Sequence, residues 1–234
     1  MQALVLAGGK GLRLRPLTEN VPKCLVDVGG KPILMHIFGW FAKHGIDEVV
    51  LAVGYKHEAV SDFLRVHGNE IPMRVALSVE DTPLGTGGGI KNAARRGLIK
   101  GDFVVVNGDV ITDADLSYMI KAFYEKKAQG VKAVMALRKE RSPYGVALVD
   151  GNLIIHSFEE KPELQDVWIN AGIYIMASDV VSILPDSGDI EKCLFPKLAW
   201  EHKLAGIKIN GYWRSVDSLK DIEEVNGELK RAES

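Results

Sequence analysis

The chain has 234 residues, of which 47% are apolar and 26% are charged, and this balance is that of an ordinary globular protein with a sizeable core. Its formal net charge of −2 excludes a general attraction to nucleic acid or to an acidic membrane surface. Any binding of anions must therefore come from local clusters of cations.

The first half of the chain alternates short apolar runs with amphipathic segments, and this predicts strands that alternate with helices. The strands are expected at 3–7, 49–54, 73–80 and 103–109, and the helices at about 31–44, 58–68, 88–97 and 113–130. This alternation predicts a Rossmann-like α/β fold, with a mixed, mostly parallel sheet flanked by helices.

In the second half strands no longer alternate with helices, because turn residues such as those at 150–152 leave no room for helices between the middle strands. Strands are expected at 132–137, 145–150, 153–158, 169–176 and 206–210, and helices at about 190–203 and 217–231. We therefore expect antiparallel strands added to the α/β core.

The N-terminus and the two cysteines predict a cytoplasmic chain without a membrane or nucleic-acid partner. MQALVLAGG has no basic leading segment, and no run reaches the roughly 18 apolar residues of a membrane span. Cys24 and Cys193 lack the spacing of a zinc site or a disulfide framework. Homo-oligomerisation is left open.

Residues 6–32, LAGGKGLRLRPLTENVPKCLVDVGGKP, place four cations on a glycine-rich turn directly after the first strand. Ligands of open α/β sheets lie beyond the carboxyl ends of the strands, where backbone N–H groups and cations can neutralise phosphates. The turn matches neither the P-loop pattern nor the glycine pattern of dinucleotide-binding folds.

In order and spacing, this stretch resembles the signature of the sugar-1-phosphate nucleotidylyltransferases: a GGxGTRLxPLT loop, then PK, then a VGGKP-type segment. The resemblance extends through nearly the whole chain and implies a fold of the nucleotide-diphospho-sugar transferase type. It implies one domain, 1–234, with 1–130 mainly binding an NTP and 131–234 mainly binding a sugar phosphate. Leu12 departs from the pattern, which has threonine there, and so removes one hydroxyl contact.

The resemblance also implies a Mg²⁺-dependent reaction in which a sugar 1-phosphate and an NTP give a nucleotide-sugar and pyrophosphate. Arg13 is expected to contact the β- and γ-phosphates, and Lys23 the α-phosphate and the sugar phosphate. Such catalysis is chiefly positioning and charge neutralisation. Arg15 is expected to be a solvated charge. The residues implied for nucleotide binding are Leu6, Ala7, Gly8, Gly9, Lys10, Gly11, Glu80, Gly85, Thr86, Gly87 and Gly108.

Two aspartates are implied as ligands of Mg²⁺. Asp109 ends a buried strand in the NGD motif, which the family uses for the metal. The second family ligand normally lies two residues after a tryptophan, but Ser215 stands there, and the aspartate is displaced to Asp217 as in the glucose-1-phosphate cytidylyltransferase branch. Asp217 is also a candidate helix N-cap, and Asp221 is expected to be a surface charge.

Three segments resemble the parts of the family that surround the sugar phosphate: PYGV (143–146), EEKP (159–162) and INAG (169–172). They imply that Glu160 accepts sugar hydroxyls, Lys161 meets the phosphate and Asn170 donates to the sugar. The Gly145 backbone is expected to line the pocket, as is Gly172.

The base is expected to lie against Glu80 in VEDTPLGTGGG, a run that also resembles the mannose- and heptose-1-phosphate guanylyltransferases. A carboxylate can accept the N1–H and N2–H₂ donors of guanine, whereas it repels the O2 and O4 acceptors of uracil or thymine. GTP with mannose 1-phosphate or a similar sugar is therefore the first expectation. CTP is the second, because cytosine offers one amino donor, and UTP and dTTP stay open.

Two other functions compete with this interpretation. Leu12 and the unusual segment 213–217 leave room for an inactive sensor that binds a nucleotide-sugar without turnover. Asp113 and Asp115 have the DxD spacing of metal-dependent glycosyltransferases, although both residues precede a predicted helix and make good caps.

Overall fold

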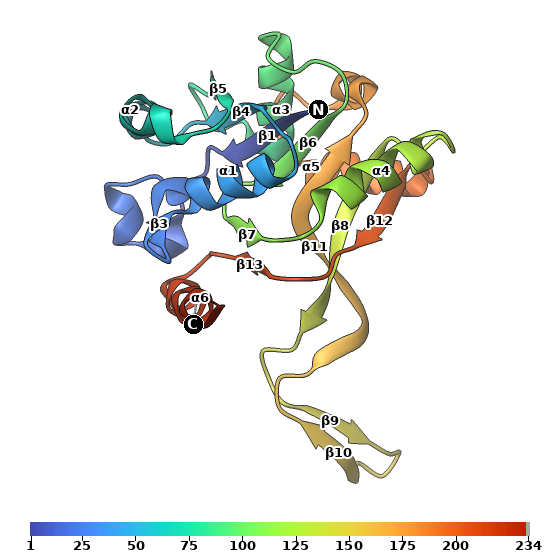
Figure 1. The fold of residues 1–234 in the computed structure, drawn as a ribbon. Coiled ribbons are helices and arrows are strands. Elements are labelled where there is room, and N and C mark those ends of the chain that lie inside the picture. The colour runs from blue at the N-terminus through green and yellow to red at the C-terminus, as the bar shows by residue number, and fades with distance from the viewer. Residues whose placement is uncertain (233–234) are drawn as a thin grey trace.

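A seven-stranded sheet forms the centre of the protein in the computed structural model, which describes residues 1–232 (Figure 1). The strand order is β12-β8-β11-β6-β1-β4-β5. Strand β11 is antiparallel to β6 and β8, and the other neighbours pair in parallel. The expected mostly parallel sheet is thus confirmed. Its strands are β1 (Gln2–Ala7), β4 (Glu48–Val53), β5 (Arg74–Val79), β6 (Phe103–Asn107), β8 (Ala133–Arg141), β11 (Glu163–Met176) and β12 (Leu204–Lys208).

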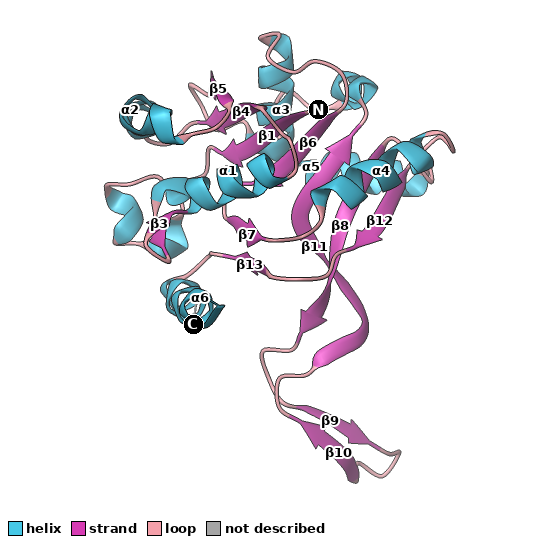
Figure 2. Cartoon of the chain, viewed as in Figure 1, coloured by secondary structure: helices cyan, strands magenta, loops and turns pink. Residues whose placement is uncertain are grey.

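Helices cover both faces of this sheet (Figure 2). In this view α1 and α4 lie in front of the sheet, whereas α3 and α5 lie behind it. The helices are α1 (Ile33–Lys43), α2 (His57–His67), α3 (Gly85–Arg95), α4 (Leu116–Lys127), α5 (Ile190–Trp200) and α6 (Leu219–Ala232). Within residues 1–232, none of them combines the length and the apolar character needed to cross a membrane.

The core lies between the central strands and these helices. Leu4 and Val5 of β1 and Val104 to Val106 of β6 are fully buried. The interiors of these strands are apolar because helices cover both of their faces, as is typical of parallel sheets.

Helix α3 begins at Gly85, so the predicted start at residue 88 was wrong. The glycine-rich run was interpreted as a loop before the helix, but it forms the first turns of the helix. A tertiary contact, described below, explains why glycine stands at these helical positions, where it is normally unfavourable.

A short pair of strands was not predicted, and it joins the middle of the chain to its C-terminal part. Strand β7 (Val110–Thr112) pairs antiparallel with β13 (Trp213–Ser215), so that Ser215 lies opposite Val110. The pairing continues where the Val216 N–H donates to the Asp109 carbonyl at 2.9 Å. The segment after β13 therefore follows the end of β6.

A second small pair supports α6. Strands β2 (Asp27–Val28) and β3 (Lys31–Pro32) form a hairpin, and the Gly29 N–H at its turn donates to Asn226 Oδ1 at 2.6 Å. Asn226 lies on α6, so this hairpin fixes the C-terminal helix.

Strands β8 and β11 continue beyond the sheet and carry a hairpin of β9 (Val146–Val149) and β10 (Ile155–Glu159). Figure 1 shows this arm extending away from the rest of the molecule. The predicted strands at 145–150 and 153–158 form there. Strand β11 begins at Glu163, six residues before the predicted start at 169, because it includes one side of the arm.

Candidate functional site

A cavity of about 660 Å³ opens at the carboxyl ends of β1, β5 and β6, beside the first turn of α3. This is the edge of the sheet where the sequence predicted a ligand. The predicted site residues that line the cavity are Leu6, Ala7, Gly8, Gly9, Gly11, Arg13, Lys23, Glu80, Gly85, Thr86, Gly108, Asp109 and Asp217. Leu12, the departure from the family pattern, also lines it and is 57% exposed.

The glycine turn is held in place by contacts of Gly11 with Thr18 and Lys23. Gly11 has φ of +59°, and a Cβ at this position would lie 3.0 Å from the Thr18 methyl group and 3.1 Å from Lys23 Cβ. The Thr18 hydroxyl donates to the Gly11 carbonyl at 2.8 Å. Gly11 is therefore needed both for its left-handed backbone and for close contact with Lys23.

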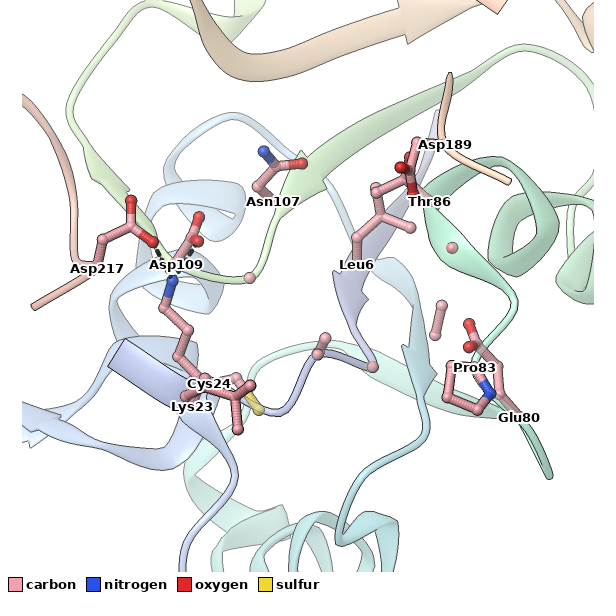
Figure 3. A pocket seen from close by; sticks show the side chains of 18 of the residues that line it. Leu6, Lys23, Cys24, Glu80, Pro83, Thr86, Asn107, Asp109, Asp189 and Asp217 are labelled. Carbon is pink, nitrogen blue, oxygen red and sulfur yellow. Dashed lines mark hydrogen bonds and ion pairs between the residues drawn. The ribbon is translucent and has the colours of Figure 1, made fainter. Parts of the chain in front are cut away.

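One ammonium group joins the two predicted metal ligands. Lys23 Nζ lies 2.5 Å from Asp109 Oδ2 and 2.8 Å from Asp217 Oδ1, and Arg13 donates to the same Asp217 oxygen at 2.8 Å. Figure 3 shows Lys23 pointing between the two carboxylates. The structure thus brings together all four residues that the sequence assigned to catalysis and metal binding.

Asp217 is held by its own neighbours as well. The Ser215 hydroxyl donates to Asp217 Oδ2 at 3.0 Å. Burial acts to raise the pKa of Asp217, but the hydrogen bond and charge of Lys23, with Ser215 and Arg13, lower that pKa overall. Ser215, at the usual ligand position, instead orients the displaced aspartate.

Asp221 shapes the loop that presents Asp217, so its expected role as a surface charge was wrong. Its Oδ2 accepts the Asp217 N–H at 3.0 Å, the Ser218 N–H at 2.7 Å and the Ser218 hydroxyl at 2.8 Å. The Asp221 N–H donates back to the Ser218 hydroxyl at 3.3 Å, which completes a capping box at the start of α6. Ser218 is thus the N-cap of α6, rather than Asp217.

The carboxylate pair fits a divalent cation that also binds substrate phosphates. Asp109 Oδ1 is buried and has no hydrogen-bond partner among the described residues. No group of three or more His, Cys, Asp or Glu side chains suitable for a metal occurs within residues 1–232. Mg²⁺ commonly uses one or two carboxylates and takes its other ligands from water and phosphates, so Asp109 and Asp217 suffice.

Glu80 lies at the other end of the cavity from Lys23 (Figure 3). Its Oε2 accepts the Leu84 N–H at 3.2 Å, next to the first turn of α3. A Cβ on Gly8 would lie 3.3 Å from Oε2, and one on Gly89 only 2.6 Å from Oε1. Burial raises the pKa of Glu80, although the hydrogen bond from the Leu84 backbone acts to lower it.

The other glycines of α3 make room for residues 185–189, the loop before α5. A Cβ on Gly85 would lie 2.7 Å from the Gly188 carbonyl oxygen, and one on Gly88 2.7 Å from the Asp186 carbonyl oxygen. The Gly87 N–H donates to the Gly188 carbonyl at 2.8 Å. Gly87 therefore packs beneath this loop and does not line the cavity.

Several lining residues were missed by the sequence prediction: Cys24, Ala52, Pro83, Asn107 and Asp189. Asn107 belongs to the NGD motif, of which only Gly108 and Asp109 were predicted to bind, and its buried Oδ1 has no hydrogen-bond partner within residues 1–232. Asp189 comes from a loop far along the chain, which no local pattern connects to the site. Burial raises the pKa of Cys24 to about 12, so this thiol is not a nucleophile.

The predicted sugar-binding residues lie outside the residues that line the cavity. Asn170 and Gly172 are near it, because a Cβ on Gly172 would lie 2.8 Å from Asn107 Nδ2, and Asn170 Oδ1 accepts the Gly172 N–H at 2.9 Å. Gly145, Glu160 and Lys161 lie on the arm, where Gly145 packs against Phe158.

Lys10 and Arg15 are both exposed, and neither lines the cavity. Arg15 therefore matches the expected solvated charge. Lys10 was expected at the triphosphate, but it is not among the residues that line the cavity.

Asp113 and Asp115 have structural roles. Asp113 Oδ1 accepts the Tyr212 N–H at 2.6 Å, and Asp115 Oδ1 accepts the Tyr118 N–H at 2.9 Å as the N-cap of α4. Neither residue lines the cavity. Asp113 thus ties two distant segments together and Asp115 caps a helix, which removes the basis for the glycosyltransferase alternative.

Sequence comparison relates this chain to proteins of a known family. A family model described as nucleotidyl transferase matches residues 2–232. A mannose-1-phosphate guanyltransferase of Yarrowia lipolytica is 39% identical over 230 residues, which are 95% of this chain and 62% of that protein. The catalytic subunit beta of a Danio rerio mannose-1-phosphate guanylyltransferase is 38% identical, with the same coverage. The chain thus spans 62% of the length of these relatives.

Structural comparison gives the same type of fold. HddC from Yersinia pseudotuberculosis, complexed with GMP-PN, has a TM-score of 0.73 and 26% identity, covering 97% of this chain and 99% of that one. A putative glucose-1-phosphate thymidylyltransferase from Bacillus anthracis has a TM-score of 0.75 and 24% identity, covering 97% of this chain and 94% of that one. At this identity the second comparison supports the fold alone.

Proposed function

We propose that this chain, which belongs to the nucleotidyl transferase family, transfers a nucleotidyl group from GTP to mannose 1-phosphate or a similar sugar 1-phosphate. The products are a GDP-sugar and pyrophosphate. The observation that carries the proposal is the arrangement of one cavity, with Lys23, Asp109 and Asp217 at one end and Glu80 at the other. These groups suit the phosphates and the base of one bound nucleotide.

The chain's own residues promote the reaction by positioning and by charge. The glycine turn at Gly8 to Gly11 approaches the triphosphate closely, and Arg13 neutralises the β- and γ-phosphates that leave. Lys23 lies between the α-phosphate and the phosphate of the sugar, and so reduces the repulsion between two reacting anions. A sugar phosphate oxygen attacks the α-phosphorus while the bond to pyrophosphate breaks.

Asp109 and Asp217 would hold the divalent cation, and Mg²⁺ is the ion that the family pattern implies. Bound there, it would supply positive charge to the phosphate oxygens of both substrates. Asp109 Oδ1, which is buried without a partner, supports this assignment.

Glu80 supports GTP as the nucleotide. A carboxylate is an acceptor only, and it suits the N1–H and N2–H₂ donors of guanine better than the single amino donor of cytosine. The guanyltransferase names of the relatives from Yarrowia lipolytica and Danio rerio agree with this choice.

The sugar phosphate is proposed to lie between the cavity and the base of the arm. Asn170 and Gly172, next to Asn107, would form the near side of this site. Gly145, Glu160 and Lys161 of the arm would form the far side. In this arrangement residues 1–130 mainly bind the nucleotide and residues 131–234 mainly bind the sugar.

The proposal is tested by a screen of GTP, CTP, UTP and dTTP against a panel of sugar 1-phosphates with Mg²⁺, in which release of pyrophosphate is measured. We expect release with GTP and mannose 1-phosphate or a close analogue. The Asp109→Asn variant is the control, and it should lose this activity while its circular dichroism stays unchanged.

Two results would contradict the proposal in different ways. Faster release with CTP and glucose 1-phosphate would overturn the choice of substrates and retain the reaction. No release from any pair, together with tight binding of a GDP-sugar, would favour the inactive sensor.

A further inference from the structure

Lys23 occupies the position between the two carboxylates where a divalent cation would be expected. We propose that, before nucleotide binds, its ammonium group is the resident cation between Asp109 and Asp217, and that nucleotide phosphates draw it away, which makes room for the metal ion. This inference rests on the proposed function for the identity of the metal ligands.

The geometry sets Lys23 apart from the other cation of the site. Its ammonium contacts one oxygen of each carboxylate, at 2.5 Å for Asp109 and 2.8 Å for Asp217, and its side chain is only 17% exposed. Arg13 contacts Asp217 alone, and its side chain is 76% exposed. Lys23 is therefore the cation that holds the two carboxylates together, whereas Arg13 is screened by solvent.

The backbone of Lys23 belongs to a hydrogen-bonded turn, so its side chain is the part that can most readily leave the carboxylates. Lys23–Leu25 form a short 3-10 helix, in which the Val26 N–H donates to the Lys23 carbonyl at 3.1 Å. Lys23 Cβ also packs near Gly11 of the glycine turn. Rotation of the side chain is thus the available route from the carboxylates to phosphates bound on that turn.

This arrangement couples metal binding to nucleotide binding. A metal ion that enters alone must displace the ammonium and leave a largely buried cation without a counter-ion, which is unfavourable. Phosphates of the nucleotide give the ammonium new partners and remove this cost. Nucleotide should therefore raise the affinity for the metal, and by linkage the metal should raise the affinity for nucleotide by the same factor.

The test measures binding of Mn²⁺ alone to the nucleotide-free full chain, by electron paramagnetic resonance of the free ion. Lys23→Met removes the ammonium and retains the length of the side chain. We expect it to bind Mn²⁺ at least about tenfold more tightly than the wild type. Lys10→Met, on the same turn but outside the cavity, is the matched control and should behave as the wild type.

Two double variants show whether the gain in Mn²⁺ affinity arises at the two aspartates. Adding Asp109→Asn or Asp217→Asn to Lys23→Met should abolish this gain, because each change removes one proposed ligand. Unchanged or weaker binding by Lys23→Met would overturn the inference, as would a gain that survives both aspartate changes.

Thermal unfolding gives a second measurement. Without metal, Lys23→Met leaves two neighbouring carboxylates without their shared cation, so its midpoint should fall and Mn²⁺ should restore it. The midpoint of the wild type should hardly respond to Mn²⁺ alone, and an equal rise in both proteins would contradict the inference. Lys23→Gln replaces Lys23→Met if the latter does not fold.

The pyrophosphate screen separates this inference from the proposed function. If the wild type releases no pyrophosphate, but Lys23→Met gains Mn²⁺ affinity that depends on both aspartates, the proposed activity is wrong and the role of Lys23 as resident cation is supported. If the wild type is active and Lys23→Met shows no such gain, the activity is supported and the inference about Lys23 is wrong.

Discussion

Alanine at two helical glycines should change stability in opposite directions. Gly39 lies inside α1 with no atom within 4 Å of the position of a Cβ, so Gly39→Ala should stabilise the protein by about 0.5–1 kcal/mol. In Gly88→Ala, the new Cβ would lie 2.7 Å from the Asp186 carbonyl oxygen and 2.8 Å from Leu84 Cβ. Overpacking of this kind costs about 1–3 kcal/mol. It opposes the gain of about 0.5–1 kcal/mol that alanine brings in helix propensity at this position as well.

Subtracting this gain leaves a net loss of up to about 2.5 kcal/mol in Gly88→Ala. In a chain of this length, about 1 kcal/mol shifts the melting midpoint by roughly 2–4 °C. Calorimetry should show a midpoint up to about 10 °C lower for Gly88→Ala and about 1–4 °C higher for Gly39→Ala.

The same variants should differ in nucleotide binding. The displaced loop at 185–189 carries Asp189, which lines the cavity, so Gly88→Ala should bind GTP more weakly in titrations well below its midpoint. Gly39→Ala should bind GTP as the wild type does. A rise in both midpoints would refute the claim that α3 needs glycine for its contact with this loop.

Three further changes test the site. Glu80→Gln should lower kcat/KM for GTP by about 10- to 100-fold, because a charged acceptor is lost, and should raise the ligand-free protein's stability at neutral pH by less than about 1 kcal/mol. Burial raises the pKa of Glu80 in the folded protein above 4.5, so ionised Glu80 destabilises the fold. This destabilisation is absent below about pH 4.5 and grows as pH rises through the folded pKa. The stability gained in Glu80→Gln should therefore vanish in acid. Arg13→Ala should lower kcat/KM by about 10- to 100-fold, whereas exposed Arg15→Ala should leave it unchanged; equal effects would reject the separate roles of these residues. Asp221→Ala should destabilise the protein by about 0.5–2 kcal/mol and weaken metal binding through Asp217, and Asp221→Glu should restore both if the capping box is the cause.

Local patterns in the sequence determined the individual strands, most helices and the chemistry of the glycine turn. The apolar β-branched runs predicted β1, β4, β5 and β6, because strands of a parallel sheet covered by helices are largely apolar. Arg13, Lys23 and Asp109 were assigned because the motifs that contain them resemble, in order and spacing, those of the nucleotidylyltransferase family.

The tertiary structure decided which distant residues meet. Asp217 reaches Asp109 through the pairing of β7 with β13, two three-residue strands whose pattern is too short to predict. Asp189 enters the cavity because a loop packs on the glycines of α3. Hydrophobic and turn patterns act over a few neighbouring residues and report local conformation, whereas such contacts depend on which surfaces the folded chain brings together.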